Sequence, residues 1–117
     1  MERLIDEGLR REAHPGVTFR DGPSGRRAGL FAGPDVDEVV RTLHHVQAEE
    51  AAGRGEDSLE PIAESLSLNV DEVRTAVAYY ADYRDEIDAR IRANQQAADE
   101  LEAAWRRQQE ILAGSTP

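Results

Sequence analysis

The sequence contains no cysteine and no lysine, and only 5% of its 117 residues are aromatic. Without cysteine the chain forms no disulfide and offers no thiolate, which suits a reducing cytoplasm. A chain of this length is one small domain, and its core has to be built from aliphatic side chains. No apolar run reaches the ~18 residues of a membrane span, and no signal-peptide pattern follows Met1. We therefore expect a soluble, cytoplasmic protein with no membrane partner.

The charge is strongly negative and unevenly distributed. The 24 acidic residues and 14 arginines give a formal net charge of −10. Residues 1–54 hold 8 arginines and 10 acids, a net charge of −2, whereas residues 55–117 hold 6 arginines and 14 acids, a net charge of −8. A local basic patch near the start consists of Arg10, Arg11, Arg20, Arg26 and Arg27. Such a split suggests two different partners.

The first third of the chain predicts a short helix followed by a β-hairpin. Residues 1–13 carry apolar side chains at helical spacing, and the "HPG" of residues 14–16 ends this arm. The segments "VTFR" and "RAGLFA" then flank "DGPSGR", which is rich in turn residues. We expect a hairpin with a six-residue loop, whose second strand includes Leu30 and Phe31. Two strands are marginal alone and must pack against helices.

Three short amphipathic or capped helical segments follow the hairpin. Asp35, with Glu38 three residues later, predicts a capping box at the start of the first. Ser58 is the expected N-cap of the second, and Asn69, with Glu72, that of the third. The expected inward-facing residues are Val36, Val39, Val40, Leu43 and Val46 in the first helix, Leu59, Ile62, Ala63 and Leu66 in the second, and Val70, Val73, Ala76, Val77 and Tyr80 in the third.

The second and third of these helices match a helix-turn-helix. Ala63 is the small residue where the helices cross, Leu68 follows the tight turn, and Val73 and Ala76 anchor the second helix. A helical hairpin that only packs is an equally simple interpretation, because short motifs also match by chance.

The exposed face of the second helix leaves that choice open. Arg74 and Thr75 suit contacts with bases or phosphates, whereas Asp71 and Glu72 would repel the DNA backbone. If DNA is bound, arginines of the hairpin must act as a basic wing beside the helix. The candidate DNA-binding residues are Arg20, Arg26, Arg27, Arg74 and Thr75.

Residues 83–112 predict one long helix with a heptad seam. The seam consists of Ile87, Ile91, Asn94, Ala98, Leu101, Trp105, Gln108 and Leu112. We expect Ile87 and Ile91 to pack into the domain. A helix of 30 residues is about 45 Å long, so the seam beyond Asn94 requires another chain, either a second copy or a groove of a different protein.

Trp105 with Arg106 and Arg107 is the strongest candidate contact on this helix. Trp and Arg are enriched among residues that anchor interfaces, and an arginine pair suits a carboxylate cluster. The alternative is that both arginines are solvated neighbours of a packed Trp105. The candidate partner-binding residues are Leu101, Trp105, Arg106, Arg107, Ile111 and Leu112.

Nothing in the sequence indicates catalysis. The three histidines are His14, His44 and His45, and the adjacent pair points about 100° apart on a helix, so it cannot hold one metal ion. We expect His44 and His45 at the surface. No phosphate-binding loop, nucleophile elbow or zinc-protease motif occurs. We predict no enzyme activity, no catalytic or metal-binding residue and no cofactor.

The order of these parts resembles the VapB-type antitoxin domain, a bacterial family of winged-helix or helix-turn-helix proteins encoded beside PIN-like toxin genes. The likeness covers residues 14–91, and its most specific parts are "RDGPSGRRAGL" with "GPDV", and "AVAYYADYRDEID". It implies a type II antitoxin that represses its operon by binding DNA, usually as a dimer. It also implies a C-terminal segment that inhibits a PIN-like, Mg²⁺-dependent ribonuclease toxin, often by inserting an arginine among its carboxylates.

Two features depart from the family pattern. An acidic insert, "QAEEAAGRGEDSLE", separates the first helix from the helix pair, and Asp71 and Glu72 argue against DNA reading. The alternative function is a stand-alone dimeric structural or regulatory protein with a coiled-coil tail and no toxin partner.

The expected fold is mainly α, with a small β-hairpin followed by a winged-helix-like helix-turn-helix domain and a long C-terminal helix. Residues 1–13 form an N-terminal arm and residues 14–82 the hairpin and helix-turn-helix domain. Residues 83–112 form the long partner-binding or dimerisation helix, and residues 113–117 a tail.

Overall fold

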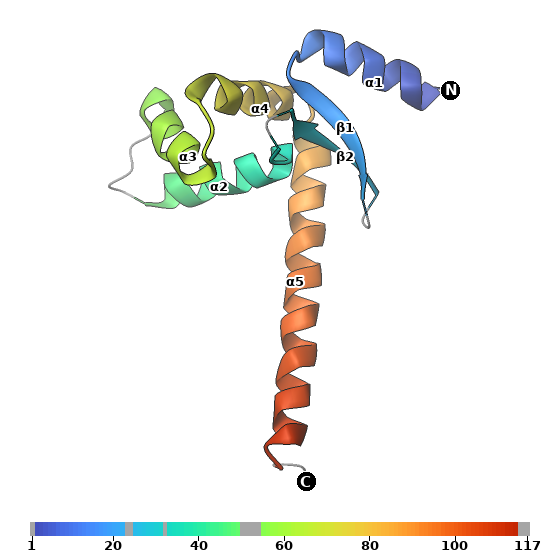
Figure 1. Ribbon diagram of the computed structural model, residues 1–117, viewed down its shortest axis with the longest axis vertical. Coiled ribbons are helices and arrows are strands. Elements are labelled where there is room, and N and C mark those ends of the chain that lie inside the picture. The colour runs from blue at the N-terminus through green and yellow to red at the C-terminus, as the bar shows by residue number, and fades with distance from the viewer. Residues whose placement is uncertain (1, 23–24, 32, 50–54, 115–117) are drawn as a thin grey trace.

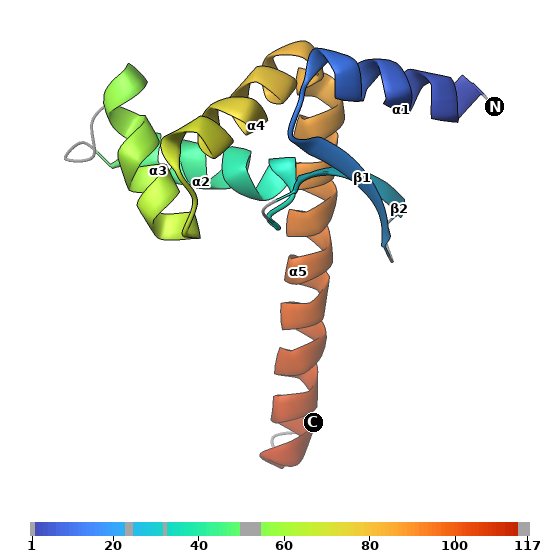
Figure 2. The same cartoon turned by 45° about the horizontal axis from the view of Figure 1, so that its top comes forward.

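The computed structural model describes residues 2–22, 25–31, 33–49 and 55–114. A helical body with a hairpin on one side sits at one end of a long projecting helix (Figures 1 and 2), and the whole measures 58 × 45 × 22 Å. The elements are α1 (Glu2–Ala13), β1 (Val17–Gly22), β2 (Gly25–Leu30), α2 (Val36–Ala48), the short 3₁₀ helix η2 (Gly55–Ser58), α3 (Leu59–Leu66), α4 (Val70–Asp82) and α5 (Arg84–Leu112). The predicted fold class, a hairpin followed by helices and a long C-terminal helix, is confirmed.

The hairpin has a tighter connection than the sequence predicted. β1 and β2 are antiparallel, and their pairing runs from Val17 opposite Leu30 to Gly22 opposite Gly25. The expected six-residue loop is therefore wrong: only residues 23–24 separate the strands, and these lie outside the described residues. Gly25 has a φ of 105°, which a residue with a Cβ rarely adopts, so glycine lets the strand begin this close to the turn.

The prediction that Phe31 belongs to the second strand is also wrong. β2 ends at Leu30, which is buried, whereas the Phe31 side chain is 74% exposed. Adjacent residues of an extended chain point to opposite sides, so Leu30 facing the core turns Phe31 outward.

The core is aliphatic and receives side chains from both strands and from α2 to α5. Its fully or nearly fully buried apolar residues are Val17, Ala28, Leu30, Val36, Val39, Val40, Val46, Leu59, Ile62, Ala63, Val73, Ala76, Tyr79 and Ile87. The predicted stripes of α2, α3 and α4 supply most of them. Tyr79, which the predicted α4 stripe missed, is fully buried, whereas the predicted Tyr80 is only partly buried. α4 contacts α2 and α3 as well as the hairpin and α5, so its buried face is wider than one stripe.

The three predicted N-cap residues all occupy the N-cap positions, but only Asn69 makes a side-chain capping bond. Asn69 and Glu72 form the expected capping box, with hydrogen bonds of 2.8 and 3.0 Å. Asp35 has the extended dihedrals of an N-cap, but its carboxylate pairs with Arg27 at 2.6 Å, so the capping box predicted with Glu38 is absent. Ser58 has helical dihedrals as the last residue of η2, and its hydroxyl donates to the Gly55 carbonyl at 2.7 Å.

The long helix α5 is packed at its start and free beyond. Ile87 is buried, Ile91 packs against the core, and Asn94 donates a hydrogen bond of 3.0 Å to Asp37 of α2. From residue 95 to residue 112 every residue except Ala104 is exposed, and Figure 1 shows this part of α5 extending away from the body. The expectation that the seam outruns the domain at Asn94 is confirmed. No helix in the described ranges is both long enough and apolar enough to cross a membrane.

Candidate functional site

The projecting half of α5 carries an unpartnered apolar surface. Leu101 is 73% exposed, Trp105 59%, Ile111 65% and Leu112 78%. We call these four residues the exposed stripe. A single exposed apolar side chain is ordinary, but four on one free helix are typical of a surface that another chain covers. Leu101, Trp105 and Leu112 lie within about 40° of one another around the helix, whereas Ile111 points about 100° away from Leu112.

The two arginines that follow Trp105 are at the same free surface. Arg106 donates a hydrogen bond of 2.6 Å to Glu102 one turn earlier, and both side chains are exposed. Arg107 is exposed as well. A solvated ion pair of this kind contributes little free energy, so Arg106 can exchange Glu102 for another carboxylate at low cost.

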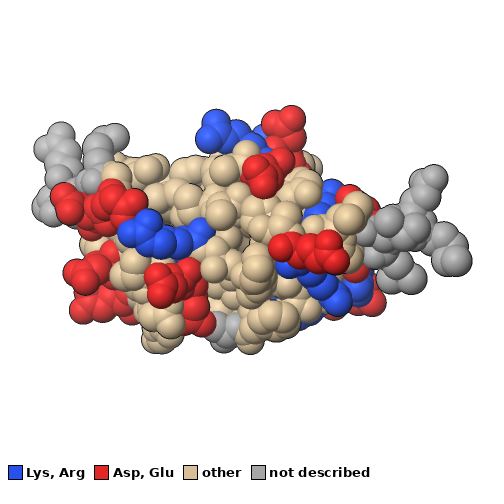
Figure 3. All heavy atoms as spheres, turned by 90° about the horizontal axis from the view of Figure 1, so that it is seen from above, with Lys and Arg blue, Asp and Glu red and all other residues tan. Residues whose placement is uncertain are grey.

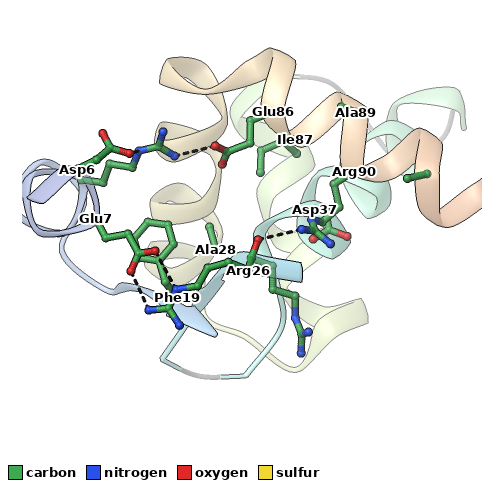
Figure 4. A pocket seen from close by; sticks show the side chains of 13 residues that line it. Asp6, Glu7, Phe19, Arg26, Ala28, Asp37, Glu86, Ile87, Ala89 and Arg90 are labelled. Atoms are coloured by element: carbon green, nitrogen blue, oxygen red, sulfur yellow. Dashed lines mark hydrogen bonds and ion pairs between the residues drawn. The ribbon is translucent and has the colours of Figure 1, made fainter. Parts of the chain in front are cut away.

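The second candidate site lies where α1, the hairpin and α5 meet. A cavity of about 380 Å³ there is lined by four arginines and four acids together with apolar side chains (Figure 4). The charged residues are Asp6, Glu7, Arg10, Arg26, Arg27, Asp37, Glu86 and Arg90. Because arginines and acidic residues line the cavity together, its wall contains a network of ion pairs.

Glu7 and Arg26 form the most buried of these ion pairs. Nε and Nη2 of Arg26 each donate a hydrogen bond of 2.8 Å to a different carboxylate oxygen of Glu7. The backbone carbonyl of Arg26 also accepts a hydrogen bond of 2.9 Å from Arg90 of α5. The hydrogen bonds to Glu7 are the main reason that the pKa of Arg26 is raised above its ordinary value. Arg26 therefore links β2 to both α1 and α5.

Arg10 connects α1 to α4 and α5. Its Nη1 donates to the Tyr79 hydroxyl at 2.7 Å and to Glu86 at 2.8 Å, and the Tyr79 hydroxyl donates to Glu86 at 3.0 Å. The guanidinium also stacks 3.9 Å from the centre of the Tyr83 ring. Burial is the largest cause that raises the pKa of Tyr79, and the hydrogen bond from Arg10 opposes that rise only in part. The three side chains thus connect α1, α4 and α5 to one another.

Asp37 is a buried acid at the start of α2. Its Oδ2 accepts the hydrogen bond from Asn94, whereas its buried Oδ1 has no hydrogen-bond partner among the described residues. Burial foremost, and then the nearby Asp35 charge, raise the pKa of Asp37, while Arg90 opposes the rise in part. Folding with Asp37 in its charged form therefore costs free energy.

The predicted DNA-binding residues of the hairpin are all engaged inside the molecule. Arg20 donates to the backbone carbonyls of Leu30 and of Gly33, the latter at 2.9 Å. Arg26 is held by Glu7, and Arg27 pairs with Asp35 at 2.6 Å. The three residues lie on one hairpin. Arg26 and Arg27 pair with acids of the chain, whereas Arg20 contacts two backbone carbonyls.

The two predicted contacts on α4 are engaged in the same way. Arg74 donates to Glu56 of η2 at 3.1 Å, and the Thr75 hydroxyl donates to the Asp71 carbonyl at 3.0 Å. On the face that Figure 3 displays, the blue arginine surfaces lie beside red carboxylates. The sequence gives the number of arginines in the chain, but not which of them lie beside an acid.

The histidines occupy two kinds of site. His44 and His45 are exposed, as expected. His14 is buried, with Nε2 2.7 Å from a carboxylate oxygen of Asp82 and with its ring 5.3 Å from that of Tyr79. In the part of the chain that the structure describes, no group of three or more His, Asp or Glu side chains is placed to hold a metal ion.

Several residues of the junction carry no signal in the sequence. Glu7 and Arg10 lie in α1, whereas Tyr79 lies in α4, 69 positions after Arg10. No spacing rule joins residues so far apart in the sequence. No protein-family model, curated protein or solved structure matches this chain. Its function therefore has to be inferred from its residues and their geometry.

Proposed function

We propose that this protein is the antitoxin of a type II toxin–antitoxin pair and that α5 neutralises a PIN-like ribonuclease toxin. The exposed stripe is the observation that carries the proposal. The body holds the first part of α5 rigidly through Ile87 and Asn94, so the stripe is presented as a preformed helical surface. An amphipathic helix that inserts into a groove is a common mode of partner recognition. The likeness of residues 14–91 to the VapB-type domain supplies the kind of partner.

The exposed stripe is large enough to matter energetically. Burial of one such apolar side chain contributes about 1.5–3 kcal/mol. Association itself costs an estimated 4–15 kcal/mol in lost freedom of motion. Four apolar side chains thus offset much of this cost, and polar contacts around them have to supply the rest. Trp105 lies within the stripe and is the expected energetic anchor.

The charge distribution suits a basic partner. The half of the chain that contains α5 has a net charge of −8. A ribonuclease presents a basic surface to its RNA substrate, and complementary fields accelerate association and orient the two proteins. Arg106 and Arg107, next to Trp105, supply the fork geometry that binds carboxylates.

Operator binding receives less support than toxin binding. Of the proposed contacts, Arg26 and Arg27 pair with Glu7 and Asp35, and Arg20 donates to backbone carbonyls. Phosphate contacts need cations that are available to DNA. DNA binding by a dimer stays a prediction, in which α3 and α4 mainly position the hairpin.

The experiment is co-expression with the product of the adjacent gene, which the proposal expects to be a PIN-like ribonuclease. We expect a stable complex and suppressed ribonuclease activity with the unchanged chain. Leu101→Ala with Trp105→Ala should weaken the complex about thirtyfold or more, the effect of losing one interface hot spot. Gln96→Ala, on the opposite face of the same helix, is the matched control and should bind normally. Active, unbound toxin beside the unchanged antitoxin would refute the proposal.

The second candidate function is the stand-alone dimer with a coiled-coil tail. The alternating steps of four and three residues along α5 favour it, because this spacing is typical of helices that pair with one another. A chain that never binds the neighbouring PIN-like protein but dimerises stably would fit this candidate and not the antitoxin.

A further inference from the structure

We propose that a second copy of this chain covers the exposed stripe when no other partner is bound, with the two α5 helices running antiparallel. The proposal goes beyond the antitoxin function and does not depend on it, because it concerns the protein alone. Its starting observation is that one seam serves two purposes. The seam residues Ile87 and Ile91 pack against the core of the domain. The seam then continues along α5 with Leu101, Trp105 and Leu112, which are exposed to solvent.

The antiparallel register matches large side chains with smaller ones. In a coiled coil, opposed seam positions form layers across the interface. With the two-fold axis on the seam side of the helix, at the height of residue 103, Leu101 of each copy meets Trp105 of the other, and Ala98 meets Gln108. A parallel pair would instead place Trp105 on Trp105 and Ala98 on Ala98, which crowds one layer and leaves another underfilled.

The charges on the free part of α5 do not decide the orientation. Asp99, Glu100, Arg106 and Arg107 lie on the outer side of the helix, roughly 120° or more from the seam. Among the charged residues from 95 to 112, Glu102 is the one beside the seam. The antiparallel orientation is therefore inferred from how the side chains of the seam fill each layer.

The length of the free helix fits this register. The 18 steps from Asn94 to Leu112 span about 27 Å at 1.5 Å per residue. In the proposed register Leu112 ends level with Asn94 of the second copy, where the seam passes beneath α2. The free segments thus overlap along their whole length, and the two bodies lie at opposite ends. The contact is isologous, as two-fold symmetry requires.

The dimer is expected to be weak and reversible. The free segment holds fewer than three heptads, and Gln108 is a polar member of the seam. A partner that binds the exposed stripe more tightly displaces the second copy, since both use the same side chains. Toxin binding and self-association are therefore mutually exclusive on one α5.

Sedimentation equilibrium of the full chain alone, over a wide concentration range, tests the proposal. We expect a reversible monomer–dimer equilibrium. Leu101→Glu places a charge in the central layer and should weaken it at least tenfold. Ala103→Glu adds the same charge on the outer face and should leave it unchanged, and circular dichroism should show equal helix content in both variants. A monomer at every concentration, or a dimer indifferent to Leu101→Glu, overturns the proposal.

The absence of native cysteine allows a direct test of orientation. Ala98→Cys alone and Gln108→Cys alone should each form little disulfide-linked dimer under oxidised glutathione, because these positions do not face themselves. An equimolar mixture of the two variants should cross-link readily. Efficient cross-linking of each variant with itself, and no gain on mixing, would exclude the antiparallel arrangement.

Discussion

Arg26 donates two hydrogen bonds of 2.8 Å to Glu7, whose side chain is only 7% exposed. The same residue accepts a hydrogen bond from Arg90 through its backbone carbonyl. A position that the sequence marks as a DNA contact is thus a structural connection between α1, β2 and α5. Its charge compensates a buried acid, so a variant at Arg26 changes the fold's stability as well as any interaction with DNA.

Arg26→Ala should lower the thermal unfolding midpoint, because it removes the bidentate partner of the buried Glu7 carboxylate. The double variant Arg26→Ala with Glu7→Gln should unfold at a higher temperature than Arg26→Ala alone, since the buried charge is then gone as well. Circular dichroism during heating measures both. If the double variant were no more stable than the single one, the charge of Glu7 would not be the cause of the loss.

Tyr79→Phe should reduce the free energy of unfolding by about 1.5–3 kcal/mol, the range for hydrogen bonds that involve charged groups. The ring stays in place, but Arg10 and Glu86 both lose their contact with the hydroxyl. Tyr80→Phe is the matched control. Tyr80 is only partly buried, and its hydroxyl donates to Asp88 at 2.6 Å, so its loss should be smaller. Urea denaturation compares the two, and equal losses would contradict the structural difference.

Asp37→Asn should stabilise the protein at neutral pH. Burial raises the pKa of Asp37 in the folded state above its unfolded value of about 3.9. The folded state therefore binds more protons between those two pKa values, and stability falls as the pH rises through that window. The asparagine keeps an oxygen that can accept the hydrogen bond from Asn94 and removes the buried charge.

The advantage of Asp37→Asn should shrink as the pH is lowered through the folded pKa and should vanish below about 3.9, where Asp37 is protonated in both states. Denaturation at a series of pH values measures this difference. Asp99→Asn, on the exposed part of α5, serves as control for the removal of one acid. A constant difference at all pH values would show that the effect does not come from the ionisation of Asp37.

Asn69→Ala should cost about 1 kcal/mol of folding free energy, because the Glu72 amide loses its side-chain acceptor at the start of α4. Asn69→Ser keeps a capping oxygen and should cost much less. Chemical denaturation distinguishes the two. Equal stability of all three proteins would mean that the capping box does not hold α4 in solution.

Features that depend on neighbouring positions were predictable from the sequence. The spacing of apolar residues predicted α2, α3, α4 and the packed start of α5. It also placed the end of packing at Asn94, beyond which α5 is exposed. The Asn69 cap followed from residues three apart. The errors at Phe31 and at the hairpin loop come from strand geometry, since the exact end of a strand depends on its pairing partner.

Partners of charged residues could not be predicted from the sequence, because they come from distant parts of the chain. Arg10 and Glu86 are 76 positions apart, and Arg26 and Glu7 are 19 apart. Asp35 is the N-cap of α2 as predicted, but its side chain makes no capping bond, since Arg27 of β2 pairs with its carboxylate. Helical periodicity is a local property, so the linear pattern was enough to predict the helices and the free surface of α5. The contacts of Arg20, Arg26 and Arg27 come from three-dimensional packing, which makes Arg26 a connection between α1, β2 and α5, while DNA binding by the hairpin stays a prediction.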